Sequence, residues 1–144
     1  MMNLVISKEL DKNAKQYIND GLFKFNLMHF PKDLGGRYED IGLFIKDENG
    51  NVHGGITAAI CWNWLEVYMF YLDEEIRKMG YGTKLLREIE TIAIEKQCDF
   101  IKLDTLSFQA LGFYEKNGYQ VFGTIDNVGR DFKHYYLKKD LKNC

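Results

Sequence analysis

The sequence lacks the features of secreted, membrane-spanning and disulfide-bonded proteins. It has one proline, and its three cysteines (Cys61, Cys98 and Cys144) are far apart and form no Cys-x-x-Cys pair. An odd number of distant cysteines is typical of a reduced compartment, not of a disulfide framework. There is no run of about 18 apolar residues and no basic leader followed by an apolar stretch. We therefore expect a soluble cytoplasmic protein without a membrane span.

The sequence also lacks an excess of basic charge. Its 144 residues include 19 Lys and Arg against 21 Asp and Glu, a formal net charge of -2. This balance argues against a nucleic-acid-binding protein that depends on phosphate neutralisation, so we expect smaller partners. The length and the 46% hydrophobic content predict a single globular domain over residues 1–144.

The first half of the chain predicts one helix and three strands. A short strand is expected at residues 4–6, followed by a helix that Ser7 caps and Gly21 ends, whereas residues 22–40 show no clear pattern. Alternating and β-branched runs then predict adjacent antiparallel strands at residues 41–46, 52–61 and 64–72. Asn49-Gly50 between the first two of these strands is the signal for a two-residue hairpin.

In the second half, apolar residues recur at helical spacing. A helix from the glycines near residue 80 to Gln97 is followed by a strand at 99–106, a short helix within 107–118, and strands at 119–125 and 133–139. A strand-helix-strand crossover is right-handed and makes its two strands parallel. The predicted fold class is α/β, with a mixed, mostly antiparallel sheet flanked by helices and a central parallel strand pair.

Gly80 and Gly82 stand where a strand passes into a helix, in the run IRKMGYGTKLL (residues 76–86). The start of a helix offers unpaired N–H groups and the positive end of the helix dipole, so a phosphate is the expected ligand. A dinucleotide fingerprint is excluded because Leu85 stands at its third glycine, and the Gly-Lys-Ser/Thr of a Walker loop is absent. A tight turn without any ligand is the alternative.

The wider pattern resembles the GNAT superfamily of N-acetyltransferases, especially its small bacterial members. The element order matches from residue 41 to residue 137. The resemblance rests on two motifs, Arg77-x-x-Gly80-x-Gly82 and Ser107-x-x-Ala110-x-x-Phe113-Tyr114-x-x-x-Gly118-Tyr119. It implies acetyl-CoA as cosubstrate, no metal, and a small-molecule or peptide amine as acceptor. The acceptor is expected to bind near the amino-terminal 40 residues, which match the family in outline.

The resemblance also implies a cofactor site. The amides of residues 78–83 would bind the pyrophosphate, and the pantetheine arm would lie along the strand that ends at Leu72. The expected cofactor-binding residues are Phe70, Tyr71, Leu72, Arg77, Lys78, Met79, Gly80, Tyr81, Gly82, Thr83, Ser107 and Phe113. Ser107 stands where the family often has asparagine, and its alternative role is to cap the next helix.

For catalysis, the resemblance implies direct attack of the amine on the thioester in a ternary complex. Tyr114 would protonate the leaving thiolate, and Glu66 would be the general base, directly or through a water. The alternatives are a core tyrosine and an exposed surface charge. Cys61 and Cys98 are expected to be buried thiols. The residues that we expect not to bind a metal are His29, His53, His134 and the carboxylates of residues 72–75.

Two other functions remain open at this stage. The chain could be a non-catalytic acyl-CoA-binding sensor or interaction domain, or an enzyme that transfers a longer acyl group. Small amines, antibiotics, amino acids, peptide N-termini and lysine are all open as acceptors. The resemblance also allows a homodimer.

Overall fold

The computed structural model describes residues 2–141, which form two compact units that divide between Gly36 and Arg37. The first unit contains helix α1 (Lys12–Leu27) and the 3-10 helix η1 (Lys32–Leu34). Within residues 2–141 no helix has the length and apolar character needed to cross a bilayer. The predicted single domain stays a prediction.

Helix α1 starts and ends later than the sequence suggested. Its cap is Asp11, whose Oδ1 accepts hydrogen bonds of 3.0 Å from the backbone N–H groups of Asn13 and Ala14. The predicted cap, Ser7, is wrong because its hydroxyl bonds to the Glu9 carboxylate instead. The predicted end at Gly21 is also wrong, because one glycine inside a helix costs only about 1 kcal/mol. Residues 4–6 are not in a strand.

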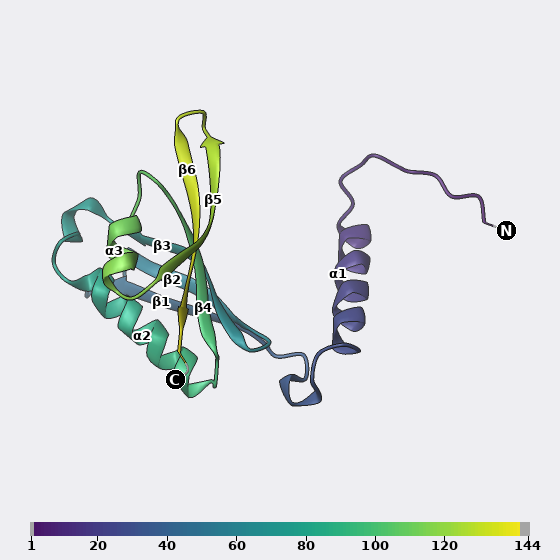
Figure 1. Cartoon of the computed structure of the whole chain (residues 1–144), viewed down its shortest axis with the longest axis horizontal. Helices are drawn as coiled ribbons and strands as arrows, with labels where there is room; N and C mark the ends of the chain where they lie inside the picture. The colour runs from purple at the N-terminus through teal and green to yellow at the C-terminus, as the bar shows by residue number, and fades with distance from the viewer. Residues whose placement is uncertain (1, 142–144) are drawn as a thin grey trace. The chain divides into compact units, whose positions relative to one another are not determined.

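The second unit is a six-stranded sheet with order β1-β2-β3-β4-β6-β5 (Figure 1). The predicted antiparallel order of the first three strands is confirmed, and so is the parallel pairing of β3 with β4. The elements are β1 (Tyr38–Lys46), β2 (Val52–Cys61), β3 (Trp64–Leu72), η2 (Glu74–Ile76), α2 (Tyr81–Glu95), β4 (Phe100–Leu106), α3 (Leu111–Lys116), β5 (Gln120–Val128) and β6 (Phe132–Asp140).

The turn between β1 and β2 has five residues instead of the predicted two. Asp47 accepts a backbone hydrogen bond from the N–H of Gly50, which has a φ of 83° and is the only residue of residues 47–51 with a positive φ. Since a two-residue type I′ turn needs positive φ at both central residues, this turn is of the longer kind that ends on a left-handed glycine. The register shift between Ile45 and Lys46 accompanies it.

The core lies between α2 and one face of the sheet. Leu86, Ile89 and Ala93 recur at helical spacing on α2 and are fully buried. Leu65 and Val67 of β3 are buried in the same cluster. Because side chains alternate along a strand, the residues between them face away from the core. We call this opposite side of the sheet the second face.

Glu90 is a buried carboxylate on α2 and predicts a measurable stability effect. Its Oε2 accepts a hydrogen bond of 3.0 Å from the Tyr119 hydroxyl and lies 3.2 Å from Lys139 Nζ. Tyr119→Phe removes the hydroxyl donor, so we expect the free energy of unfolding to fall by about 1–3 kcal/mol in urea denaturation. Tyr17→Phe, at an exposed position, should change it by less than about 0.5 kcal/mol. If both variants have the same free energy of unfolding, the interaction with Lys139 alone is enough to satisfy the buried Glu90 carboxylate.

Candidate active site

The turn between β3 and α2 presents backbone N–H groups at the start of a helix. Lys78 and Gly80 have φ values of 64° and 88°, and Met79 between them does not share this left-handed conformation. Such alternation curls the chain so that successive N–H groups point to one side and form an anion-binding nest. Gly80 is the N-cap of α2, and no side chain caps this end. The first amides of α2, in residues 81–83, therefore have no intrahelical acceptor.

The two glycines of this turn serve different purposes. A Cβ at Gly80 would meet no atom within 4 Å, but the backbone there is left-handed, a conformation that costs other residues about 1–2 kcal/mol. A valine at Gly80 would therefore strain the backbone of the turn. A Cβ at Gly82 would lie 3.5 Å from Phe113 Cζ and 3.6 Å from Leu72 Cδ1, which is ordinary contact. A Cβ alone would therefore fit at Gly82, next to α3 and the end of β3.

β3 and β4 pair over only a short segment and then separate. Beyond their paired segment, β3 continues to Leu72 and β4 to Leu106 without pairing to each other. Tyr68 is an extra residue opposite the Thr57/Ala58 step of β2, and such a bulge bends the strand. The only β3–β4 pairs are Trp64–Phe100, Leu65–Ile101 and Glu66–Lys102. The backbone of residues 67–72 that faces β4 therefore lacks a partner on β4, and this gap lies at the carboxyl ends of a parallel pair, next to the start of α2.

Tyr114 lies on α3 beside the end of β3. Its side chain is 6% exposed, and its ring lies 6.3 Å from the ring centroid of Phe70 and 5.4 Å from that of Phe113. Within residues 2–141 no hydrogen bond occupies its hydroxyl. Burial, and to a lesser extent the charge of Asp104, raises the pKa of Tyr114 to about 12. The phenol is therefore protonated at neutral pH.

Glu66 lies on the second face, because its neighbours Leu65 and Val67 point into the core. Its Oε1 accepts a hydrogen bond of 3.1 Å from Trp64 Nε1 and lies 3.5 Å from Lys102 Nζ. The side chain is 19% exposed, so it is not the freely exposed charge of the alternative reading. Oε1 is occupied, which leaves Oε2 as the oxygen that could accept a proton.

The comparisons with known proteins decide the family. Residues 14–119, more than half of the chain, match the family model for the acetyltransferase (GNAT) family. The chain belongs to the GNAT acetyltransferase family. An acetyltransferase of Agrobacterium fabrum, Atu2258, is 30% identical over 138 residues, which cover 96% of this chain and 98% of the relative.

Two further relatives agree with this membership. The crystal structure of an acetyltransferase from Bacillus cereus is 31% identical and superposes with a TM-score of 0.87, covering 95% of this chain and 98% of that one. The blasticidin-S acetyltransferase of Streptomyces morookaense is 32% identical over 95 residues, which cover 65% of this chain and 70% of the relative. Together with the six-stranded mixed sheet, these matches confirm the predicted fold and an acetyltransferase activity.

Most of the residues predicted to bind the cofactor of this GNAT protein lie in the turn or on the elements beside the gap between β3 and β4. They are Phe70, Tyr71 and Leu72 at the end of β3, residues 77–83 in the turn, and Phe113 on α3. Arg77 closes the turn: its Nε donates to the Leu72 carbonyl at 2.9 Å, and its guanidinium lies 5.5 Å from the centre of the Tyr71 ring. Its role toward a cofactor stays a prediction.

Ser107 stands apart from the turn, between β4 and α3. Its Oγ accepts a hydrogen bond of 3.0 Å from the backbone N–H of Lys133, and its own N–H donates to the Lys133 carbonyl. The alternative role of Ser107 as a helix cap is wrong, because α3 has Ala110 as N-cap and no side-chain cap at all. The Ser107 hydroxyl proton is still available to a ligand.

The structure also groups polar residues that sequence reasoning did not connect. On the second face, His134 Nε2 lies 2.6 Å from Asp104 Oδ2, and the Tyr136 hydroxyl lies 3.3 Å from His134 Nδ1. The sequence could reveal this group only if the register of β4 against β6 were known, because in that register Asp104 pairs with Tyr136. These groups share the second face with Glu66 and are further proton-transfer candidates there.

The prediction of buried thiols holds for Cys98 but only in part for Cys61. Cys98 is buried and Cys61 is half-buried, and both are free thiols. Burial raises the pKa of each thiol, which disfavours the nucleophilic thiolate. Cys144 lies outside the described residues.

Proposed function

We propose that this protein is an acetyl-CoA-dependent N-acetyltransferase that transfers the acetyl group to an amine by direct attack in a ternary complex. The observation that carries the proposal is the uncapped start of α2 at the carboxyl end of the separated β3–β4 pair. The free amides near Gly80 and Gly82 suit a pyrophosphate, and Lys78 and Lys84 add positive charge. The unpaired edge of β3 beside them suits the remainder of the cofactor.

The pantetheine arm of acetyl-CoA fits the unpaired edge of β3. The arm is extended and carries amide groups, so it can hydrogen-bond to residues 67–72 as an added strand would. In this arrangement the pyrophosphate lies at the turn and the thioester lies along the gap between the strands, toward the point where β3 and β4 meet. Tyr114, which packs against Phe70, would then be near the sulfur.

The reaction needs a neutral amine, an N–H donor for the oxyanion, and a stabilised leaving thiolate. In the proposed scheme the amine nitrogen attacks the thioester carbonyl, the C–S bond breaks, and Tyr114 donates to the sulfur. The amine loses its proton to Glu66 Oε2 directly or through a water. The acceptor is a small-molecule or peptide amine, and the relative that acetylates blasticidin S is an example of the first kind.

Release of free CoA thiol, measured with a panel of amines, tests this function. The panel should include amine-containing antibiotics, free amino acids, polyamines and peptides with a free N-terminus or lysine. We expect at least one amine to give acetylated product, seen by mass spectrometry, together with one equivalent of CoA. Tight binding of acetyl-CoA without release of thiol for any amine would favour the non-catalytic acyl-CoA-binding domain.

Glu66→Gln should lower turnover most at low pH. A general base matters most where few amine molecules are already neutral, so the loss should shrink as the pH rises. We expect an effect of about 10- to 100-fold at the low end, within the usual range for general bases. The measurement is the pH–rate profile at saturating acetyl-CoA. Lys102→Gln is the matched control, since it removes the ion-pair partner but keeps the carboxylate.

A Glu66→Gln profile that parallels the wild-type profile at every pH would assign the base elsewhere. The Asp104–His134 pair on the same face would then be the next group to substitute.

A further inference from the structure

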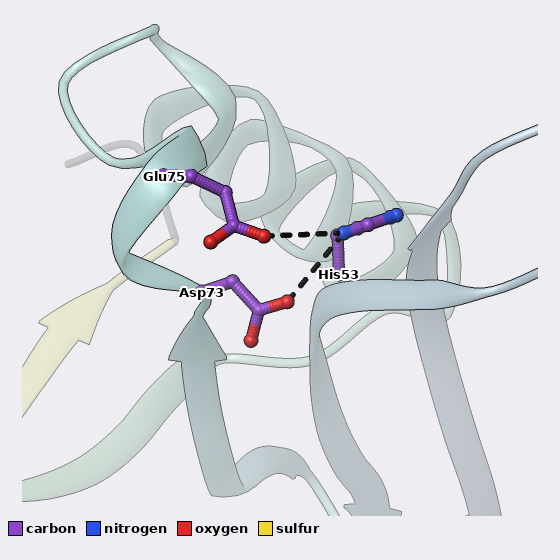
Figure 2. A group of neighbouring side chains, drawn as sticks. All are labelled: His53, Asp73 and Glu75. Carbon is purple, nitrogen blue, oxygen red and sulfur yellow. Dashed lines mark ion pairs between the residues drawn. The ribbon is translucent and has the colours of Figure 1, made fainter.

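His53, at the start of β2, faces three carboxylates next to the proposed pyrophosphate turn. Its Nε2 lies 2.9 Å from Asp47 Oδ2 in the β1–β2 turn. On the other side, its Nδ1 lies 3.5 Å from Asp73 Oδ2 and 3.9 Å from Glu75 Oε1, as Figure 2 shows. Asp73 and Glu75 belong to the segment between β3 and residue 77. His53 thus connects one end of β2 to the chain that leads into the turn.

The backbone supports the same connection. The Asp73 N–H donates to the His53 carbonyl at 2.8 Å, so the two residues are held side by side. The space around them is tight: a Cβ at Gly54, next to His53, would lie 2.8 Å from the Tyr71 carbonyl oxygen. A change in the interaction between His53 and Asp73 therefore acts on the segment that starts the turn.

The surroundings fix how the imidazole is oriented. Asp47 Oδ1 accepts hydrogen bonds of 2.9 and 3.0 Å from the backbone N–H groups of Asn49 and Asn51, which hold its carboxylate against His53 Nε2. Nδ1 is buried and has no hydrogen-bond partner within residues 2–141. If the Nε2 N–H donates a hydrogen bond to Asp47, a neutral ring would point its Nδ1 lone pair at the carboxylates of Asp73 and Glu75. An imidazolium would direct an N–H at them instead.

The charges near His53 favour this protonated form. The hydrogen bond to Asp47 and the charges of Asp47, Asp73 and Glu75 raise the pKa of His53 above its ordinary value. The same hydrogen bond, with those from residues 49 and 51, lowers the pKa of Asp47 to about 2. Asp47 from the turn and Asp73 and Glu75 from the η2 segment are the charged groups of residues 2–141 that act on the ring.

We infer that protonated His53 is a positioning residue for acetyl-CoA, which holds Asp73 and Glu75 and thereby the turn at residues 77–83. This inference rests on the proposed function. The imidazolium also offsets carboxylate charge close to where a pyrophosphate would bind. Because the contact exists below the pKa of His53 and is lost above it, affinity for acetyl-CoA should fall as the pH rises.

The test is the dissociation constant for acetyl-CoA, measured by calorimetry between about pH 6 and about pH 9. Relative to His53→Gln, the wild type should bind about 2- to 10-fold more tightly at the low end, the size expected for one or two partly exposed ion pairs. The advantage should disappear at the high end. Turnover at saturating acetyl-CoA should be similar in both proteins, because the effect is on binding.

Matched variants separate positioning from a general structural role. His29→Gln makes the same kind of substitution in the first unit, residues 2–36. It should keep the wild-type pH dependence of the affinity for acetyl-CoA. Asp47→Asn removes the partner that holds Nε2, so the loss of affinity should occur at a lower pH. Glu75→Gln, at a side chain that is 72% exposed, removes one of the two carboxylates that Nδ1 faces, so affinity should depend less on pH than in the wild type, even if His53→Gln folds poorly.

Three results would overturn the inference. The first is an identical pH dependence of affinity in the wild type and in His53→Gln. The second is an increase of Tm by Mg²⁺ or Zn²⁺ in the wild type that His53→Gln lacks, because a metal ion would then occupy the place of the proton. The third is absence of acetyl-CoA binding by the wild type at any pH, and this result alone would also refute the proposed function.

Discussion

Replacing Tyr114 with phenylalanine should lower turnover by about 10- to 1,000-fold and leave the affinity for acetyl-CoA unchanged. The substitution keeps the ring that packs against Phe70 and Phe113, so this aromatic packing is preserved. It removes only the hydroxyl, which makes no hydrogen bond within residues 2–141 and costs little stability to lose. Steady-state kinetics with calorimetry for the cofactor separates the two quantities.

The pKa of Tyr114 limits how the hydroxyl can act. A thiol has a pKa of about 8.5, so complete proton transfer from a phenol with a pKa of about 12 would be uphill by about 5 kcal/mol. We therefore expect Tyr114 to stabilise the departing thiolate by donating a hydrogen bond, with the proton following as the sulfur leaves. Such a bond is stronger in the transition state than with the neutral thioester.

The control for this prediction is Tyr38→Phe, which removes the hydroxyl of an exposed side chain that bonds to Asp40 on β1. It should retain wild-type turnover. If Tyr114→Phe also turns over at the wild-type rate, Tyr114 is a core tyrosine and the thiolate leaves without its help.

Gly82→Val should weaken acetyl-CoA binding by about 10- to 100-fold while the protein stays folded. The Cβ itself fits in ordinary contact with Phe113 and Leu72. The two methyl groups of valine then crowd the space between the turn, the end of β3 and α3, where we place the cofactor. Crowding of this kind costs about 1–3 kcal/mol. Calorimetry with acetyl-CoA and a thermal melt measure the two effects.

Gly112→Val is a close control for the glycine prediction. Gly112 is the second residue of α3, as Gly82 is the second residue of α2, and a Cβ there meets nothing within 4 Å. We expect wild-type affinity from Gly112→Val. Unchanged affinity in folded Gly82→Val would mean that Gly82 serves only the strand-to-helix turn.

The sheet was predictable because its signals are local. The bounds of β2 and β3 match the predicted residues 52–61 and 64–72, since alternation and β-branched residues mark them directly. The parallel pairing of β3 with β4 followed from the strand-helix-strand crossover that joins them. The start of α1 was missed because both Ser7 and Asp11 can cap a helix, and local sequence does not rank them.

The candidate site was predictable only where a short motif marks it. Gly80 and Gly82 mark the turn in the sequence, and Gly80 is needed there because its backbone is left-handed. No comparable motif marks His53, whose partners Asp47 and Asp73 come from different turns. The surroundings of Glu66 likewise depend on the register that places Lys102 beside it.

The most direct test of the account is a titration of ¹⁵N-labelled protein with acetyl-CoA, followed by NMR of the backbone amides. The account predicts saturable shifts concentrated in residues 78–84, at the start of α2, and in residues 67–72, along the unpaired edge of β3. Shifts confined to other parts of the sheet, such as the β5–β6 hairpin, or no shifts at millimolar acetyl-CoA, would contradict it.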